Sequence, residues 1–252
     1  MQRYFVSREN WGDGDLHITG HDVHHISRVM RMDAHDKIIC IHPDEGAALC
    51  EIKELTDDDV ICEIREWLSE DRELPVHVTI VQSLGKGDKL EQVVQKGTEL
   101  GAYSFIPFQA DRSVAKWDEK KVSKKVQRLC KIAKEASEQS ERTHIPEVTT
   151  LYTLNDILEL KDSYTWCFFG YAEEARQNDS AALSEQISQI QPGDKVLIMF
   201  GPEGGFSEQE VERLKEHQFQ SVRLGPRILR METAPLYFMS ALSFRLEESD
   251  IG

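Results

Sequence analysis

The chain has 252 residues, of which 40% are hydrophobic and 30% are charged, and its formal net charge is −15. This length is sufficient for one large domain or for two unequal domains. The negative charge argues against a protein that coats nucleic acid indiscriminately, because such binding depends on Lys and Arg side chains that neutralise phosphates. A local basic face is still compatible with it.

The first ten residues, MQRYFVSREN, contain no apolar run of the kind found in signal peptides. No apolar stretch elsewhere is long enough to span a bilayer. We therefore expect a cytoplasmic protein without a membrane anchor. The five cysteines lack the C-x-x-C spacing of a zinc ribbon or a redox pair, which predicts buried and reduced thiols.

Residues 1–70 are predicted to form a small β-rich domain. Apolar segments bounded by turn residues predict strands at 4–6, 16–18, 37–42, 47–55 and 60–67. Several short strands joined by tight turns are typical of a small barrel. Apolar residues at helical spacing predict one helix between the second and third strands, over residues 21–32.

This helix carries both histidines and arginines. Three histidines have a spacing that a metal could use, namely His21, His24 and His25. No carboxylate or cysteine completes a convincing ligand set, so no metal is expected. Arg28 and Arg31 project from one side of the helix. With Arg3 and Arg8 they form either a basic patch for RNA or an ordinary solvated face.

Residues 69–75, SEDRELP, are polar and end in proline, which indicates a domain boundary. Beyond it, strands are predicted at 76–82, 104–108, 165–169, 196–200 and 222–224, and helices at 88–100, 116–142 and 181–190. This alternation predicts a mostly parallel sheet. Asp88 and Glu91 have the spacing of a capping pair at the start of the first of these helices, and Gly101 is suited to end it.

Residues 116–134 are the most basic stretch of the chain. This segment contains eight Lys or Arg residues against Asp118 and Glu119. Its apolar residues, expected to face the core, are Val122, Val126, Leu129 and Ile132. The cations either grip RNA phosphates or form a solvated helix face.

Residues 195–246 organise the rest of the chain. The apolar residues 196–200 run into a glycine-rich turn at 201–205, and Ser207 with Glu210 then has the spacing of a capping box. The turn lacks the Lys-Ser/Thr of a P-loop and the G-x-G-x-x-G of a dinucleotide fold. Taken alone, it is equally compatible with a simple tight turn.

The same pattern repeats shortly afterwards. The strand at 222–224 ends at Gly225-Pro226, and an irregular loop leads to a last helix that accepts Pro235 in its first turn. Ligands of α/β proteins usually bind at the carboxyl ends of the strands. We therefore predict the active site at these two loops.

Six motifs in order cover nearly the whole length: HHISRVMRM (24–32), LGKGDKLEQVVQKGTELG (84–101), RSV (112–114), EASEQSER (135–142), GPEGGF (201–206) and LGPRILRMETA (224–234). With them, residues 75–252 resemble the SPOUT class of S-adenosylmethionine-dependent RNA methyltransferases. The whole chain is similar to the bacterial 16S ribosomal RNA uridine-N3 methyltransferase family. Met231 departs from the pattern, because threonine is more usual there.

The resemblance implies a PUA-like β-barrel domain at 1–70 that helps to hold RNA. It also implies an α/β methyltransferase domain at 75–252 tied in a deep trefoil knot, and an obligate homodimer with each cofactor pocket beside the partner chain. Pattern reasoning alone predicts an ordinary unknotted sheet, because knots are nearly absent among folds.

The implied reaction moves a methyl group from S-adenosylmethionine to N3 of a uridine in 16S ribosomal RNA, expected to be uridine 1498 in conventional numbering. N3 carries a proton and is a poor nucleophile until that proton leaves. Catalysis needs alignment, a route for the proton and stabilisation of charge on the uracil oxygens. No metal is required, because a sulfonium is already an activated methyl donor.

The family motif carries over onto Arg230 and Glu232 as catalytic residues. Our hypothesis is that Arg230 places a cation near the uracil oxygens and that Glu232 accepts the N3 proton or orients the base. The alternative is an ordinary ion pair that fixes the loop. Residues expected at the cofactor are Phe200, Gly201, Glu203, Gly204, Gly205, Leu224, Gly225, Ile228, Leu229 and Thr233. Residues expected at RNA are Arg3, Arg28, Arg31, Arg112 and Arg227.

Two rival functions stay open at this point. The glycine loops would also suit a nucleotide-binding α/β enzyme. Such an enzyme should have a Lys-Ser/Thr pair or a magnesium-binding carboxylate beside a loop, and Lys86 and Asp88 match this requirement only weakly. A non-catalytic RNA-binding module would leave LGPRILRMETA unexplained. The acidic total charge favours recognition by local arginines of a structured target, so we expect assembled small subunits to be preferred over free RNA.

Overall fold

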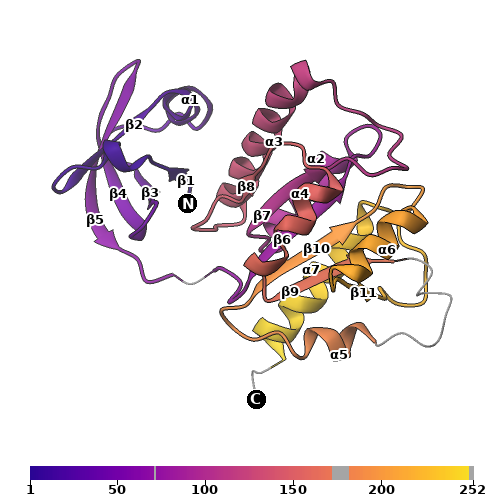
Figure 1. Cartoon of the computed structure of the whole chain (residues 1–252). Helices are drawn as coiled ribbons and strands as arrows, with labels where there is room; N and C mark the ends of the chain where they lie inside the picture. Colours follow the sequence, from indigo (N-terminus) through magenta and orange to yellow (C-terminus); the bar gives the residue numbers. More distant parts are fainter. Residues whose placement is uncertain (71, 172–181, 250–252) are drawn as a thin grey trace. The chain divides into compact units, whose positions relative to one another are not determined.

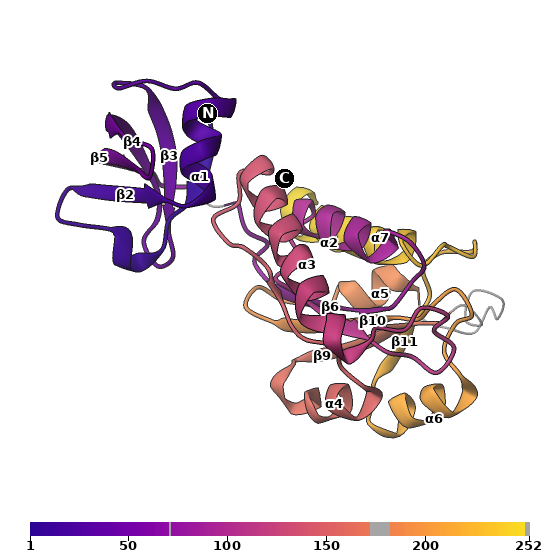
Figure 2. The ribbon, with the colours of Figure 1, turned by 90° about the horizontal axis from the view of Figure 1, so that it is seen from above.

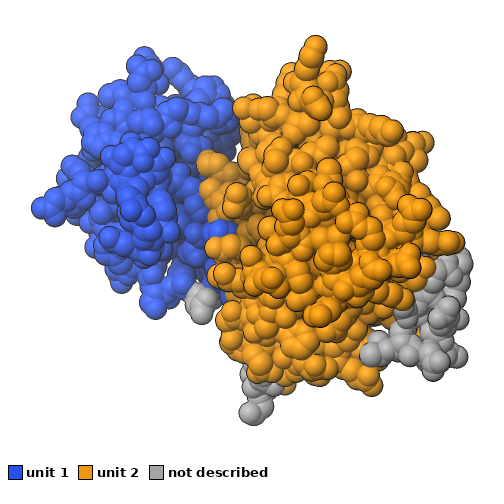
Figure 3. Space-filling model, viewed as in Figure 1, with its two compact units in different colours: residues 1–73, 137–144 blue, residues 74–136, 145–252 orange. Residues whose placement is uncertain are grey.

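The computed structural model describes residues 1–70, 72–171 and 182–249 (Figure 1). The chain divides into two compact units (Figure 3). The first comprises residues 1–73 and 137–144, and the second comprises residues 74–136 and 145–252. None of the described helices has the length and apolar character needed to cross a membrane.

The first unit contains a curled five-stranded sheet with the strand order β1-β3-β4-β5-β2. Its strands are β1 (Arg3–Phe5), β2 (Asp15–Thr19), β3 (Lys37–His42), β4 (Gly46–Leu55) and β5 (Asp59–Trp67). All pairings are antiparallel except that of β1 with β3. The predicted β-rich domain is confirmed, and its third strand has the predicted bounds.

The helical segment between β2 and β3 is shorter than predicted. It consists of α1 (His21–His24) and the π-helical turn η2 (His25–Val29). Arg31 adopts a φ of 54°, and this left-handed conformation ends the helix before residue 32. Val23 and Ile26 are buried against the sheet, whereas Val29 and Met30, which share the same predicted helical spacing, are exposed. One further turn, η1 (Arg8–Asn10), precedes β2.

The second unit contains a six-stranded sheet with the order β11-β9-β10-β6-β7-β8, in which every pairing is parallel. Its strands are β6 (His77–Ser83), β7 (Ser104–Phe108), β8 (Glu147–Val148), β9 (Trp166–Gly170), β10 (Lys195–Phe200) and β11 (Gln220–Val222). The predicted parallel sheet is confirmed. Its last strand ends two residues earlier than predicted.

Helices cover both faces of this sheet (Figures 1 and 2). They are α2 (Lys89–Glu99), α3 (Glu119–Gln139), α4 (Leu154–Glu159), α5 (Leu183–Ile187), α6 (Glu208–Glu216) and α7 (Thr233–Ser243), with short turns at η3 (Lys161–Ser163) and η5 (Phe244–Glu248). Alternate residues of β10 face opposite sides. Val196, Ile198 and Phe200 pack with α2, α3, α5 and α7, whereas Leu197 and Met199 pack with α4 and α6.

The helix ends test the capping predictions. The Ser207 hydroxyl accepts from the Glu210 N–H at 3.1 Å, and Glu210 accepts from the Ser207 N–H at 2.7 Å, which confirms that capping box. The Asp88–Glu91 pair was wrong. Asp88 has a ψ of 10° and makes no side-chain cap, and Glu91 instead binds Arg128. Gly101, with a φ of 87°, follows α2 as predicted.

Two further expectations are corrected by the described helices. The basic helix begins at residue 119 and ends at residue 139, and the helix expected at 181–190 is limited to 183–187; residue 181 lies outside the described residues. Leu129 is buried, while Val122, Val126 and Ile132 are half-buried, so the predicted apolar side does face the core. The cysteine prediction holds for four residues, but Cys130 is exposed.

Candidate functional site

The parallel sheet brings the two predicted glycine loops to one edge. The carboxyl ends of β9, β10 and β11 all lie there, with β9 in the middle. Gly170 ends β9, and a Cβ at this position would lie 3.1 Å from the Phe200 ring and 3.6 Å from Leu224. The missing side chain therefore lets Phe200 and Leu224 fill the space between the loops. Sequence reasoning missed Gly170, although a glycine at the end of a predicted strand is a usable signal.

The first loop presents backbone on one side and open space on the other. A Cβ at Gly201 would lie 3.2 Å from the Phe206 nitrogen, so no side chain fits there. Gly205 has a φ of 68°, and no atom lies within 4 Å of its Cβ position. In the second loop, Gly225 has a φ of 74° and faces the Tyr237 hydroxyl. Of these three glycines, Gly205 is the one that leaves the loop backbone open to close approach by a ligand.

A lysine joins the two loops. Lys89 lies at the start of α2, directly after the loop that follows β6, and its Nζ lies 2.8 Å from Glu203 Oε1 and 3.7 Å from Glu232 Oε2. The hydrogen bond to Glu203 raises the pKa of Lys89. Partial burial acts to raise the pKa of Glu203, but the Lys89 hydrogen bond and charge outweigh it, so that pKa is lowered. Both groups are therefore charged at neutral pH.

Glu232 occupies an unusual position for a carboxylate. Its side chain is 19% exposed, and its buried Oε2 has no hydrogen-bond partner among the described residues. The Lys89 ammonium at 3.7 Å is close enough to attract this oxygen but too far to donate a hydrogen bond. This carboxylate oxygen is thus held beside a cation without accepting a hydrogen bond.

The predicted alternative, an Arg230–Glu232 ion pair, does not occur among the described residues, because Glu232 pairs with Lys89 instead. Arg230 is exposed, and its carbonyl accepts from the N–H groups of Thr233 and Ala234 at 2.9 and 3.0 Å. The backbone of Arg230 therefore fixes the start of α7 and leaves its guanidinium free to turn outward.

Met231, the departure from the family pattern, packs inward. It is 6% exposed, and a Cβ on Gly85 would lie 2.6 Å from its sulfur. The side chain thus seats the loop between β11 and α7 against the loop that follows β6. Met231 fills this space by packing, a task that a threonine hydroxyl would not perform.

Arg112 lies beside the first glycine loop. Its Nη1 donates to the Gly204 carbonyl at 3.3 Å. The neighbouring Asp111 N–H donates to Glu210 Oε1 at 2.9 Å, and the Ser113 hydroxyl lies 2.9 Å from that of Ser83. The segment 110–113 is therefore tied both to the glycine loop and to the end of β6.

Of the other arginines predicted to contact RNA, three are exposed and one is buried. Arg227 is exposed in the second loop, and Arg28 and Arg31 are exposed in the first unit. The expectation for Arg3 must be corrected, because its side chain is 1% exposed and pairs with Glu70 at 2.7 Å. Arg3 therefore serves the packing of the first unit rather than its surface. Arg8 pairs with Asp44 at 2.6 Å.

The three histidines of the first unit do not converge on a ligand. His25 Nδ1 lies 3.0 Å from the Tyr4 hydroxyl, whereas His21 and His24 are exposed. Within residues 1–70, 72–171 and 182–249, no group of three or more His, Cys, Asp or Glu side chains has an arrangement suited to a metal ion.

Comparison with known proteins identifies the family. A family model described as an RNA methyltransferase domain matches residues 72–243, and one described as an RNA methyltransferase PUA domain matches residues 18–65. The ribosomal RNA small subunit methyltransferase E of Bacillus subtilis is 48% identical over 98% of each chain. This protein belongs to the ribosomal RNA small subunit methyltransferase E family.

Solved structures of the family agree with this assignment. The Neisseria gonorrhoeae small subunit methyltransferase E, bound to S-adenosyl methionine, is 28% identical with a TM-score of 0.84 over 97% of this chain and 98% of that one. A Legionella pneumophila structure with the cofactor SAM bound is 27% identical with a TM-score of 0.83 over 96% and 97%. The fold is therefore the SPOUT-type α/β fold with a PUA-like domain that the sequence motifs implied.

The buried carboxylate of Glu210 is predicted to hold the glycine loop. Glu210→Gln keeps one acceptor but turns an NH2 group toward a backbone N–H, which should lower the free energy of unfolding by about 1–3 kcal/mol. Glu208→Gln, an exposed change in the same first turn, should cost less than about 0.5 kcal/mol. Urea unfolding of both variants measures the difference. Equal midpoints for the two variants would contradict the role of Glu210.

Proposed function

We propose that this protein transfers a methyl group from S-adenosylmethionine to N3 of one uridine in 16S ribosomal RNA of the small subunit, expected to be uridine 1498, in the cytoplasm. The observation that carries the proposal is Glu232, whose buried Oε2 lies beside Lys89 at the glycine loops without a hydrogen-bond donor. An N–H group such as that of uracil N3 is the partner this oxygen lacks. The family and its SAM-bound structures support the same reading.

The residues at the strand ends fit the cofactor. S-adenosylmethionine supplies an activated methyl group on a sulfonium. Gly205 leaves the loop backbone open to a ligand, whereas Gly201 lets the loop pack closely on its own residues. The remaining candidates belong to the two loops and their flanking elements, namely Phe200, Glu203, Gly204, Leu224, Gly225, Ile228, Leu229 and Thr233. Phe200 is itself buried, so it supports the loops by packing against Gly170 rather than by contacting the ligand with its ring.

Two side chains would act on the base, and a third would hold one of them in place. Glu232 would accept the proton from N3 while N3 forms its bond to the methyl carbon and the methyl–sulfur bond breaks, with S-adenosylhomocysteine leaving as a neutral thioether. Lys89, whose Nζ lies 3.7 Å from Glu232 Oε2, holds this carboxylate in place and is therefore a positioning residue. Arg230, exposed at the same loop, turns its guanidinium toward the uracil oxygens, where charge develops.

The remaining proposals concern the partners. Arg112 and Arg227 contact RNA from the second unit, and Arg28 and Arg31 contact it from the first. A homodimer would cover apolar side chains that α7 and its surroundings leave exposed, namely Ile228 (59%), Tyr237 (37%) and Phe244 (65%). The trefoil knot likewise stays a prediction from the resemblance.

Methyl transfer to small subunits from cells that lack this protein tests the function. With labelled S-adenosylmethionine, mass spectrometry should find 3-methyluridine at one site, at a higher rate on assembled subunits than on deproteinised 16S RNA. Methylation of another nucleotide would show that uridine 1498 is not the target. Binding of ATP in preference to S-adenosylmethionine would favour a nucleotide-binding enzyme whose glycine loops hold phosphates. Binding of S-adenosylmethionine without any methyl transfer would favour a non-catalytic RNA-binding protein.

Gly205 is predicted to be essential for cofactor binding. Gly205→Ala adds a Cβ on the open side of the loop and should weaken S-adenosylmethionine binding by about tenfold or more, or about 1.4 kcal/mol. Gly193→Ala is the matched control, since Gly193 also has a positive φ (90°) and open space at its Cβ position. Each variant should lose about 1–2 kcal/mol of stability from backbone strain. Calorimetry that finds equal cofactor affinity in both would refute the prediction.

Glu232→Gln should slow the chemical step. Loss of the proton acceptor is expected to lower the single-turnover rate at neutral pH by about 10²- to 10⁴-fold, with little change in cofactor affinity. Glu208→Gln removes the same charge from an exposed site and should keep the full rate. A full rate in Glu232→Gln would show that the carboxylate only fixes the loop.

A further inference from the structure

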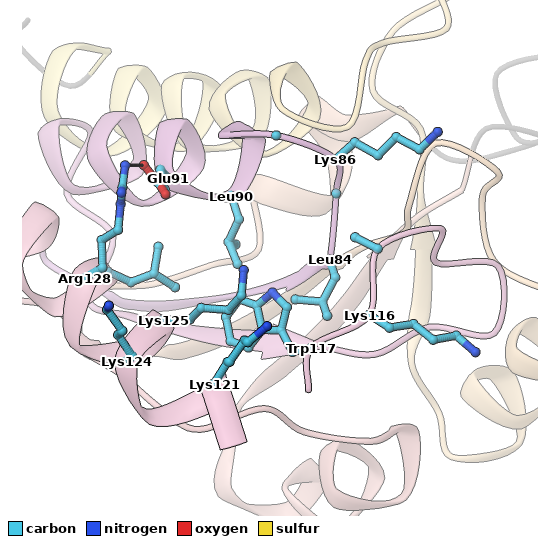
Figure 4. Close-up of a pocket in the computed structure, with 14 residues that line it drawn as sticks. Leu84, Lys86, Leu90, Glu91, Lys116, Trp117, Lys121, Lys124, Lys125 and Arg128 are labelled. Carbon is cyan, nitrogen blue, oxygen red and sulfur yellow. Dashed lines mark hydrogen bonds and ion pairs between the residues drawn. The ribbon is translucent and has the colours of Figure 1, made fainter. Parts of the chain in front are cut away.

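A second concave site lies beside the proposed active site in the second unit. Its volume is about 570 Å³, within the range of pockets that bind small molecules or single nucleotides. Its walls come from the loop after β6, the start of α2 and the first turns of α3, together with the segment that precedes α3 (Figure 4). None of the glycine-loop residues proposed to hold the cofactor lines it.

The charge of this pocket is opposite to that of the protein. Its cationic lining residues are Lys86, Lys116, Lys121, Lys124, Lys125 and Arg128. The one carboxylate in the lining is Glu91, which binds Arg128 at 2.7 Å. Six cations less one anion leave a net charge of +5 within a chain of net charge −15. Such a concentration of like charges costs folding energy and indicates a polyanionic ligand.

An aromatic ring lies among these cations. Trp117 is half-buried and lines the pocket, and Lys125 Nζ lies 5.3 Å from the centre of its ring. Leu84, Leu90 and Leu129 supply an apolar floor. Figure 4 shows Lys121 and Lys125 of α3 beside the indole. An aromatic face bordered by lysines is the arrangement on which single-stranded nucleic acids stack their bases while their phosphates are neutralised.

The pocket is linked to the proposed active site by direct packing. Gly85 and Lys86 line the pocket, and Met231 packs against Gly85. Met231 stands in the sequence between the two proposed catalytic residues, Arg230 and Glu232. Lys89, which holds Glu232, begins α2 only one residue before the lining residue Leu90. A nucleotide in the pocket would therefore lie against the same loop that packs on Met231.

We propose that this pocket binds an unpaired nucleotide of the substrate RNA close to the target uridine, with its base stacked on Trp117 and its flanking phosphates held by Lys121 and Lys124. The proposal rests on the proposed function, and it adds an anchoring site for single-stranded RNA. It explains how a protein of net charge −15 holds RNA at one place, because the lining of this pocket is locally cationic.

Charge-neutralised variants with a matched control test the phosphate contacts. Lys121→Gln/Lys124→Gln removes two pocket cations, whereas Lys120→Gln/Lys131→Gln removes two exposed cations of the same helix that do not line the pocket. The probe is a fluorescent single-stranded oligoribonucleotide of about ten nucleotides, followed by anisotropy at several salt concentrations. The pocket variant should bind at least about tenfold more weakly, with a salt slope smaller by about 1.4. The control should change by less than about twofold.

Two variants of Trp117 test the stacking. Trp117→Leu should weaken oligonucleotide binding by about five- to 100-fold, whereas Trp117→Phe keeps an aromatic face and should recover most of the affinity. Thermal unfolding of each variant shows whether packing is intact. Because the lysine variants change only exposed groups, they keep the proposal testable even if Trp117→Leu proves unstable.

The outcomes separate this proposal from the proposed function. In methylation assays, the pocket variants should raise KM for small subunits while kcat and S-adenosylmethionine affinity stay unchanged. Normal methylation with equal KM in the pocket and control variants would overturn the RNA pocket and leave the function standing. Oligonucleotide binding that depends on the pocket, without any methylation, would support the RNA pocket and contradict the proposed function. A raised KM for subunits with unchanged oligonucleotide binding would assign the pocket to a ribosomal protein and also overturn the proposal.

Discussion

The parallel pairing of β9 with both β10 and β11 is the constraint on which the site depends. It places the loops after β10 and β11 at one edge but separates them by one strand, or about 10 Å. Because Gly170 has no side chain, Phe200 and Leu224 can occupy the space at the end of β9, and the gap between the two loops is filled. A ligand at this edge therefore meets two loops at once, and both can present backbone to it.

The electrostatic link across the site is made by a single ammonium. Glu203 and Glu232 lie on different loops, and both are within 4 Å of Lys89 Nζ. The two carboxylates carry like charges, and the nearby cation offsets their repulsion. Lys89 donates a hydrogen bond to Glu203 and lies only near Glu232, so it attracts the second carboxylate without donating a hydrogen bond to it. That asymmetry suits a proton acceptor better than a structural ion pair.

Local interactions were predictable from the sequence, and distant ones were not. The strands at 37–42 and 104–108 and the Ser207–Glu210 capping box depend on neighbouring residues, and all have the predicted bounds or bonds. The pairing of Lys89 with Glu232 joins residues 143 positions apart in the chain, and no periodicity records it. The resemblance named Glu232, but only the folded sheet shows which cation holds it.

Charged residues were the least predictable class, because their roles depend on burial. Arg3 and the basic residues of α3 look alike in the sequence as surface cations. In the structure Arg3 is enclosed with Glu70, whereas Lys121 and Lys124 are exposed in one pocket. Surface charges act over about 8–10 Å at physiological salt, so this pocket is screened from most of the acidic surface. Local arrangement, not the net charge of −15, therefore decides where this protein attracts a polyanion.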